Sequence, residues 1–475
     1  MNKKRISPLA QQLRYVILDL VSGALAFGIF NVVRYYLLPE SHYGYRTLWI
    51  YLFSTKLVVE QCVVPVAMLG IYWLSGYYNL PFGKSRLQEL TTTSFTALIN
   101  TVLIYLVLLI NDQTGHRIIN YELIAILFGV LFIFTYLGRL IVTTYATEHF
   151  RQDQWHFRTL IIGNSGASRI VAEKLVKGPS RVRYTIGGFV NIPGECPFND
   201  GKGAIELEEV EETCKRLGID QLILAPEVYN EEKVLNLVYR LFPLEIPIKI
   251  SPDTFSFVTS AIRLKDIYGE PFVDLASPVM SEASRNIKRT FDVAVSILVL
   301  LVLSPLFGIL AWIISRGSKG RVIYTQERIG LHQKPFLIYK FRTMYNDAEA
   351  SGPQLSEAND PRITPTGRWL RKYRLDELPQ FWNVLKGDMS IVGPRPEREH
   401  FIKQIVKQAP YYTLVCQVRP GITSWGMVKY GYASSVAQMV ERTRYDLIYL
   451  GNMSLSVDIK ILIYTVRTVV TGRGI

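Results

Sequence analysis

Long apolar runs dominate the first third of the chain. Four of these runs each approach the ~20 apolar residues that a helix needs to cross a bilayer core. They lie at about 15–38, 57–77, 94–110 and 123–145, and the second run contains Glu60. The pattern therefore predicts a four-helix transmembrane bundle within residues 1–150.

Basic residues mark one side of this predicted bundle. They precede the first run, separate the second from the third, and end or follow the fourth: Lys3, Lys4, Arg5, Arg14, Lys84, Arg86, Arg139, Arg151 and Arg158. The other two loops hold only Arg46 and Arg117. Because Lys and Arg are retained on the cytoplasmic side of a membrane, the N-terminus and all residues after 150 are predicted to be cytoplasmic.

Residues 151–278 alternate between short apolar runs and amphipathic stretches. The strand-like runs are FRTLII, YTIGGFV, QLILA and PIKIS, and the helical patterns between them include ELEEVEETCKRLG and EEKVLNLVYRLF. This alternation predicts an α/β, Rossmann-like module with a parallel sheet. Its first turn, Gly163 to Gly166, lacks the full GxGxxG spacing, and Asn191 stands where a ribose-binding acid is expected. A cofactor site and a regulatory or oligomerising module both remain open.

The third segment, residues 279–475, begins with an apolar run that a proline interrupts. Val293 to Ile314 carries no charge, but Ser304 and Pro305 lie near its middle, where proline breaks or kinks a helix. Each arm then has at most ~12 residues, or ~18 Å, which is too short for a ~30 Å core. Basic residues flank both ends: Lys288, Arg289, Arg316, Lys319 and Arg321. We therefore expect a re-entrant helix over 290–316, with a fifth spanning helix as the alternative.

Composition narrows the class of partner. The chain has 475 residues, 49% of them hydrophobic, and a formal net charge of +13. Such a charge favours anionic partners, but the basic residues flank apolar runs instead of forming one block, so nucleic acid is not expected. The four cysteines show no CxxC spacing, which argues against a disulfide framework and a zinc site. They are Cys62, Cys196, Cys214 and Cys416.

Cationic motifs are concentrated in the segment after the predicted re-entrant helix. YKFRTM places two cations on alternate residues, which face one side in a strand. DPRIT and RKYRLDEL supply further arginines, and GPRPE holds one arginine between two prolines. Arginine and lysine at this density suit phosphate oxygens. The candidate phosphate-binding residues are Lys340, Arg342, Arg362, Arg371 and Arg395.

One acidic pair, Asp376–Glu377, lies among these cations. Pro379 and Gly387 predict a helix of about two turns that begins just after the pair. An acid at such a position is often a helix cap, and the end of the helix also favours bound phosphate. The surrounding cations favour the interpretation that the pair is catalytic.

The order of these motifs resembles the bacterial sugar transferase family, the monotopic phosphoglycosyl transferases. KRTFDV, QERIG, YKFRTM, DPRIT, LDELPQFWNVLKGDMSIVGPRPE and RPGIT follow one another through residues 286–475. The four helices and the degenerate Rossmann-like module look like the long form of this family. The continuation RPGITSWGMVKYG departs from the usual family pattern and leaves the identity of the sugar open.

The resemblance implies transfer of a hexose-1-phosphate from a UDP-sugar to undecaprenyl phosphate, with release of UMP, at the start of capsule, O-antigen or exopolysaccharide assembly. It implies that Asp376 attacks the sugar-bearing phosphorus and carries a covalent phosphosugar, and that Asp376 and Glu377 hold Mg²⁺, with orientation of Asp376 as the alternative role of Glu377. It further implies an inner-membrane enzyme whose catalytic domain, 279–475, faces the cytoplasm. The N-terminal modules favour a homodimer, and the C-terminal run LSVDIKILIYTVRTVVTGRG suits either an interfacial or a packing helix.

Two other functions remain open at this point. A membrane-bound nucleotide-sugar dehydratase or epimerase requires an intact glycine fingerprint and a Tyr-x-x-x-Lys helix. One such match, Tyr229 with Lys233, lies too soon after Gly163 for that fold. A membrane assembly protein with an inert transferase domain is the non-enzymatic alternative.

Overall fold

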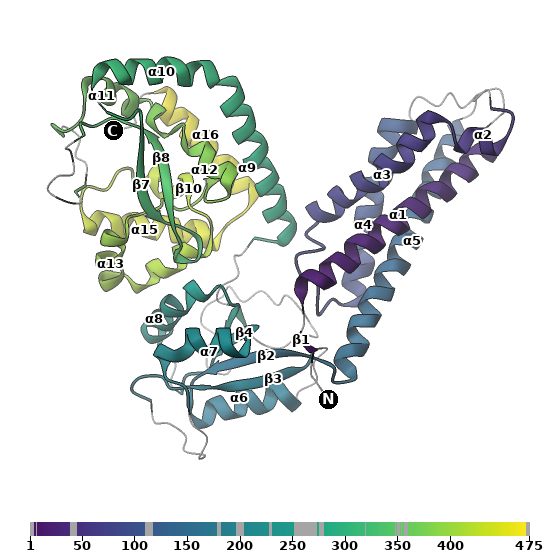
Figure 1. The fold of residues 1–475 in the computed structure, drawn as a ribbon, viewed down its shortest axis with the longest axis horizontal. Helices are drawn as coiled ribbons and strands as arrows, with labels where there is room; N and C mark the ends of the chain where they lie inside the picture. Colours follow the sequence, from purple (N-terminus) through teal and green to yellow (C-terminus); the bar gives the residue numbers. More distant parts are fainter. Residues whose placement is uncertain are drawn as a thin grey trace.

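The computed structural model describes most of the chain in three lobes (Figure 1). The described residues are 4–5, 7–38, 45–109, 117–177, 182–195, 204–227, 230–250, 273–274, 280–318, 320–346, 348, 352, 354–355 and 360–471. Of the residues named above, Lys3, Cys196, Tyr229 and Lys319 lie outside these parts.

The N-terminal lobe is an elongated bundle of apolar helices (Figure 1). Its helices are α1 (Pro8–Leu37), the short α2 (Leu48–Leu52), α3 (Thr55–Leu74), α4 (Arg86–Ile104) with its continuation η2 (Tyr105–Leu109), and α5 (Arg117–Arg151). In the part of the chain that the structure describes, α1, α3, α4 with η2, and α5 are each long and apolar enough to cross a membrane. The prediction of four such helices is confirmed.

A buried ion pair lies inside this bundle. The Nη2 of Arg139 on α5 lies 2.9 Å from Oδ2 of Asp19 on α1. The hydroxyl of Tyr78 donates to the same oxygen at 2.8 Å, and Arg139 Nη1 donates to Thr93 Oγ1 on α4 at 3.0 Å. Charges removed from water need such partners, so the network holds three helices together. Arg139 is thus an interior residue of the bundle, and its pairing with Asp19 accounts for its charge without reference to a side of the membrane.

The second lobe is built on a sheet that is mostly parallel. The strands β2 (Trp155–Ile162), β3 (Tyr184–Val190), β4 (Gln221–Leu224) and β5 (Ile248–Ile250) run parallel in the order β3-β2-β4-β5, and β6 (Val273–Asp274) pairs antiparallel with β5. The helical elements are α6 (Gly166–Lys177), η3 (Leu207–Glu209), α7 (Val210–Leu217), α8 (Glu231–Leu241) and η4 (Phe242–Leu244). Alternate strand residues pack on α6 and on α7 with α8, so two apolar cores cover the two faces. A sheet with helices, in the predicted order of elements, is therefore present.

The turn after β2 is held together by its own side chains. Asn164 Nδ2 donates to Asn191 Oδ1 at 3.0 Å, and Asn191 Nδ2 donates to Glu206 Oε1 at 2.7 Å. Arg169 donates to Asn164 Oδ1 at 3.1 Å and lies 3.6 Å above the ring of Phe189. Asn164 and Asn191, which follow the carboxyl ends of β2 and β3, are thus hydrogen-bonded to each other and to neighbouring charged side chains.

The first described residues of the chain also belong to this sheet. β1 (Lys4–Arg5) pairs in parallel with Trp155 and His156 at the start of β2. Ser7 then caps α1, where its hydroxyl accepts a hydrogen bond from the Ala10 backbone at 3.3 Å. Because α5 leads directly into β2, the sheet holds the chain on both sides of the helical bundle.

The third lobe combines a two-stranded hairpin with short helices. A bent helix pair, α9 (Glu282–Val302) and α10 (Ser304–Gly317), precedes the hairpin of β7 (Ile323–Ile329), η6 (Leu331–Gln333) and β8 (Pro335–Phe341). There follow α11 (Pro365–Lys372), η7 (Leu375–Glu377), α12 (Gln380–Lys386), β9 (Ser390–Val392), α13 (Glu399–Gln408), η8 (Pro410–Gln417), β10 (Gly421–Thr423), α14 (Trp425–Lys429), α15 (Val436–Gly451) and α16 (Leu455–Val470). The short strands β9 and β10 pair in parallel.

The pair α9–α10 is bent by 62° at Leu303. Pro305 occupies the first turn of α10, where it needs no backbone N–H partner, and Ser304 Oγ donates to Leu301 O at 2.8 Å. The break therefore falls at Ser304 and Pro305. Large apolar side chains around the bend are exposed: Leu298, Leu301, Val302, Ile309 and Trp312.

Both arms of this bent pair are fastened to the third lobe. On α9, Lys288 Nζ lies 2.7 Å from Asp458 Oδ2 of α16. After the end of α10, the carbonyl oxygen of Ser318 accepts a hydrogen bond from Arg342 Nη2 at 2.7 Å. Both arms thus pack against the same lobe, and exposed apolar side chains are concentrated around the bend between them.

The other two lobes each contact the third. Asn79, between α3 and α4, donates to Glu282 Oε2 of α9 at 2.8 Å. Gln333, at the tip of the β7–β8 hairpin, donates to the carbonyl oxygen of Tyr239 on α8 at 2.8 Å. These contacts link the bundle to α9 and the sheet lobe to the hairpin.

Candidate active site

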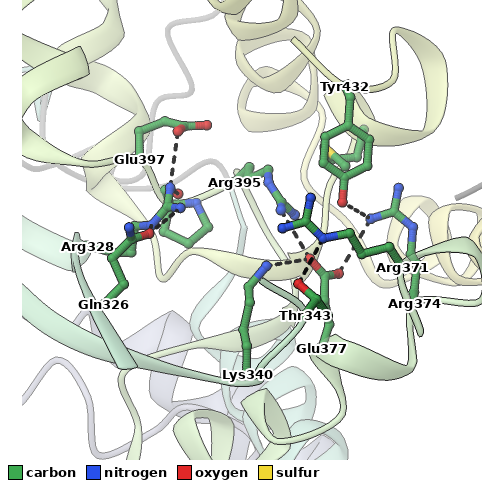
Figure 2. Close-up of polar contacts among 12 residues, drawn as sticks. Gln326, Arg328, Lys340, Thr343, Arg371, Arg374, Glu377, Arg395, Glu397 and Tyr432 are labelled. Atoms are coloured by element: carbon green, nitrogen blue, oxygen red, sulfur yellow. Dashed lines mark hydrogen bonds and ion pairs between the residues drawn. The ribbon is translucent and has the colours of Figure 1, made fainter. Parts of the chain in front are cut away.

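The β7–β8 hairpin forms one side of the site. Its strands pair antiparallel over their full length, and the turn uses His332 and Gln333 in the left-handed region, with φ of 53° and 60°. Lys340 lies near the end of β8, and its ammonium group points at Glu377 (Figure 2).

The acidic pair lies in η7, directly before α12. Arg374 precedes it with φ 53° and ψ 25°, a left-handed conformation that costs a non-glycine residue about 1–3 kcal/mol and is concentrated at functional sites. The predicted helix is confirmed, since α12 ends at Gly387 with φ 97°. Neither η7 nor α12 has a side-chain cap hydrogen bond, so Asp376 is not a helix cap.

Glu377 is buried among three cationic side chains. Its Oε1 accepts hydrogen bonds from Lys340 Nζ at 2.9 Å and from Arg395 Nη2 at 3.1 Å. Its Oε2 accepts from Arg374 Nη1 at 3.4 Å (Figure 2). Both carboxylate oxygens are therefore committed to cations.

The Asp376 carboxylate is buried as well, but its surroundings differ. Among the residues that the structure describes, it accepts no hydrogen bond, although the charges of Lys340, Arg371 and Arg374 act on it. Cations therefore lie near the Asp376 carboxylate without donating a hydrogen bond to it.

The two neighbouring acids therefore titrate differently. Burial raises the pKa of Asp376, and the positive charge of Lys340 is the largest opposing influence. Burial also acts to raise the pKa of Glu377, but Lys340, Arg395 and Arg374 together outweigh it and hold that pKa well below its usual range. Paired acids whose environments separate their pKa values commonly have separate roles. The two carboxylates thus have different environments: Glu377 is bonded to three cations, whereas Asp376 accepts no hydrogen bond from a described residue.

A second buried ionic group, centred on Glu397, lies next to Arg395 along the chain. Glu397 accepts from Arg328 Nη1 of β7 at 3.3 Å and is also paired with Arg442 of α15. Asp446 of α15 accepts a hydrogen bond from the backbone N–H of Gly426 at 2.9 Å, and burial raises the pKa of this acid to about 6. The Pro-Arg-Pro segment is fastened to β7, because Arg328 Nη1 also donates to Pro396 O at 3.0 Å, and the following Glu397 is fastened to α15.

Residues 283–472, which include every residue of the site, match the family model of the bacterial sugar transferases. The sugar transferase EpsL of Bacillus subtilis, which is described as uncharacterized, is 39% identical over 190 residues, which are 40% of this chain and 90% of EpsL. This chain belongs to the bacterial sugar transferase family.

Longer relatives of this sugar transferase have more specific names. A UDP-glucose:undecaprenyl-phosphate glucose-1-phosphate transferase of Escherichia coli is 35% identical over 308 residues, 64% of this chain and 66% of that protein. A UDP-N-acetylgalactosamine-undecaprenyl-phosphate N-acetylgalactosaminephosphotransferase of Aeromonas hydrophila is 42% identical over 200 residues, 42% of this chain and 47% of that protein. The chain therefore matches about half to two thirds of the length of these two relatives.

The structure brings some of the predicted phosphate-binding residues together. Lys340 and Arg395 meet at Glu377. Arg371 Nε donates to Thr343 Oγ1 at 2.9 Å, beside the cluster (Figure 2), and its charge lowers the pKa of Asp376. These three cations all lie close to the acidic pair.

Two other predicted arginines of the sugar transferase make different contacts. Arg342 lies just past the end of β8 and donates to Ser318 O and to Asn346 Oδ1, the latter at 3.3 Å. Arg362 is held by Asp360, with Nη2–Oδ2 at 2.6 Å. The structure does not bring either guanidinium into contact with the acidic pair.

Several residues of the site were not among the sequence candidates. They are Arg328, Arg374, Glu397, Tyr432 and Arg442. The i,i+3 spacing of Arg374 and Glu377 is a signal for a pair on one helical turn, and it was available in the sequence. Tyr432 has no such signal, because its partners lie far away along the chain.

Proposed function

We propose that this sugar transferase moves a hexose-1-phosphate from a UDP-sugar to undecaprenyl phosphate and releases UMP. The observation that carries this proposal is the position of Asp376. Its carboxylate accepts no hydrogen bond from a described residue, and it lies beside the cations that contact Glu377. The activities in the names of the two long relatives agree with it. Capsule, O-antigen or exopolysaccharide assembly is the setting for such a product.

The chemistry divides into two displacements at one phosphorus. An Asp376 oxygen bonds to the sugar-bearing phosphorus, and the bond to the UMP oxygen breaks, so that UMP leaves with the electron pair. A phosphate oxygen of the lipid then attacks the same phosphorus, and the acyl-phosphate bond breaks to restore the carboxylate. Lys340, Arg371, Arg374 and Arg395 stabilise the charge on the phosphate oxygens in both steps.

The residues present suit Mg²⁺ held largely by the substrate. Among the described residues, no group of three or more His, Cys, Asp or Glu side chains is placed to hold a metal ion. Since the oxygens of Glu377 accept from cations, Asp376 is the side chain that would hold the ion, and the substrate phosphate would supply the further oxygen ligands that Mg²⁺ prefers. When bound, the ion screens the diphosphate charge from the carboxylate.

We place the catalytic lobe on the cytoplasmic face of the bacterial inner membrane, with α9–α10 as a re-entrant anchor. The attachment of both arms to one lobe and the exposed apolar side chains at the bend support this arrangement. On α16, the exposed residues Ile459, Ile463 and Val466 form an apolar stripe opposite the buried Asp458 and Ile461, which suits an interfacial helix that also packs on the lobe. A homodimer is part of the same proposal.

The direct test mixes purified protein in detergent with Mg²⁺, undecaprenyl phosphate and a panel of UDP-sugars. We expect UMP release with at least one UDP-sugar, formation of a lipid-linked sugar, and loss of both with EDTA. Hydride chemistry with NAD(P) in the absence of lipid would support the dehydratase alternative, and no reaction with any sugar would support an inert assembly protein.

Lys340 should control the pH dependence of the reaction. Its charge opposes the burial that raises the pKa of Asp376, so Lys340→Gln raises that pKa further. Because the attacking carboxylate must be ionised, the acid limb of kcat/KM should move to higher pH by about 1–3 pH units. Lys386→Gln, at the exposed end of α12, is the control and should leave the limb in place. If Lys340→Gln leaves the acid limb unchanged, that limb does not report the ionisation of Asp376.

A further inference from the structure

Tyr432 lies in the segment between α14 and α15, against two cations of the site (Figure 2). Its ring centre is 5.0 Å from the Arg374 guanidinium carbon and 5.4 Å from that of Arg395. Its hydroxyl oxygen accepts a hydrogen bond from Arg374 Nη1 at 3.2 Å. The side chain is 37% exposed, so Tyr432 lies at the rim of the site.

The Nη1 of Arg374 is shared between two acceptors. It lies 3.4 Å from Glu377 Oε2 and 3.2 Å from the Tyr432 hydroxyl. Lys340 and Arg395 contact Glu377 more closely, at 2.9 and 3.1 Å. Arg374 is therefore the cation that Glu377 holds least tightly, and the one most easily turned towards an incoming phosphate.

The backbone places a further constraint on Arg374. Its φ of 53° lies in the left-handed region, which residues with a side chain rarely adopt. Asp376 follows two residues later. A guanidinium that is not held from both sides can collapse onto Glu377, where the charge attraction is strongest. The hydroxyl of Tyr432 opposes this collapse, because it provides the second acceptor on the other side.

We propose that Tyr432 is a positioning residue that holds the Arg374 guanidinium away from full pairing with Glu377 and ready for the diphosphate of the donor. This inference rests on the proposed function and names the residue that sets donor affinity. The phenol does not react. It acts through Arg374, whose positive charge contacts the donor phosphate.

The test is a double-mutant cycle of Tyr432→Phe and Arg374→Gln in the full-length protein. KM and kcat are measured with a UDP-sugar that the wild type uses, and the Kd of UDP is measured by calorimetry for all four proteins. Tyr432→Phe alone should raise KM and Kd about tenfold, the usual effect of losing a hydrogen bond to a charged group, and leave kcat within about twofold. In the Arg374→Gln background the same change should alter Kd less than about twofold.

Tyr430→Phe is the matched control, because Tyr430 is in the same segment and is also 37% exposed, but its ring contact is with Tyr445. It should leave KM and Kd unchanged. Equal effects of Tyr432→Phe with and without Arg374, or an effect no larger than that of Tyr430→Phe, would overturn the inference. A wild-type protein that releases no UMP would instead overturn the proposed function, so the two failures are distinguishable.

Discussion

Asp376→Asn should lower UMP release at least about a thousandfold, since removal of a covalent nucleophile leaves only binding and electrostatic stabilisation. Asparagine has nearly the same shape as aspartate, and Asp376 accepts no hydrogen bond that the change would break among the described residues. The folded state should therefore persist while turnover is lost. The measurement is initial-rate UMP release, together with capture of a radiolabelled phosphosugar on the protein in the absence of lipid.

Asp388→Asn is the appropriate control for this experiment. Asp388 follows α12, its side chain is 26% exposed, and it pairs with Lys386 at 3.5 Å. Its substitution should leave activity within about twofold, because partly exposed ion pairs contribute little. Turnover by Asp376→Asn close to that of the wild type, or label retained on that variant, would exclude Asp376 as the nucleophile.

Glu377→Gln should have the largest effect on stability. The change removes the one charge that Lys340, Arg374 and Arg395 share, and leaves three cations facing each other in a largely buried site. Breaking a buried ion pair from one side costs about 3–5 kcal/mol, so we expect a clearly lower Tm in detergent. Activity should also fall, because the cations lose the anion that orients them.

The pH dependence of this loss follows from the lowered pKa of Glu377. A depressed pKa stabilises the fold above the unfolded value of about 4.3, and the contribution disappears as pH falls through the folded value. The difference in Tm between wild type and Glu377→Gln should therefore be full at neutral pH and shrink in acid. Glu441→Gln, which removes an exposed pair with Arg444 on α15, should change Tm very little. An equal Tm loss in both variants would contradict the role of Glu377.

Local signals in the sequence predicted much of the fold. Pro379 and Gly387 bound α12 because one suits the start of a helix and the other its left-handed end. The apolar runs of the sheet lobe became β2, β3, β4 and β5, since continuous apolar stretches suit strands buried on both faces. The contacts of Lys340 and Arg395 with Glu377 lie within the segment whose motifs resemble the sugar transferase family.

Long-range partners account for what the sequence could not predict. Arg139 reads as a boundary charge until its partner Asp19, distant in the chain, is known. Arg342 would share a face with Lys340 in a continuing strand, but β8 ends at Phe341 and the next side chain turns to Ser318. Tyr432 meets Arg374 only after the chain between them has folded. Periodicity and spacing describe neighbours, and these three contacts are not between neighbours.

The pairing of β1 with β2 limits how the helical bundle can move relative to the sheet lobe. A bundle tied by a single covalent connection would be free to swivel and tilt. Here the strand before α1 and the strand after α5 are paired in one sheet at Trp155 and His156, so the bundle is joined to the sheet lobe by two adjacent supports. Phe82, between α3 and α4, adds a third contact, because its ring packs against Trp155 and Phe157 of β2. Contacts from three separate parts of the bundle restrain rocking as well as twisting, so a change in the tilt of the bundle would carry the sheet lobe with it.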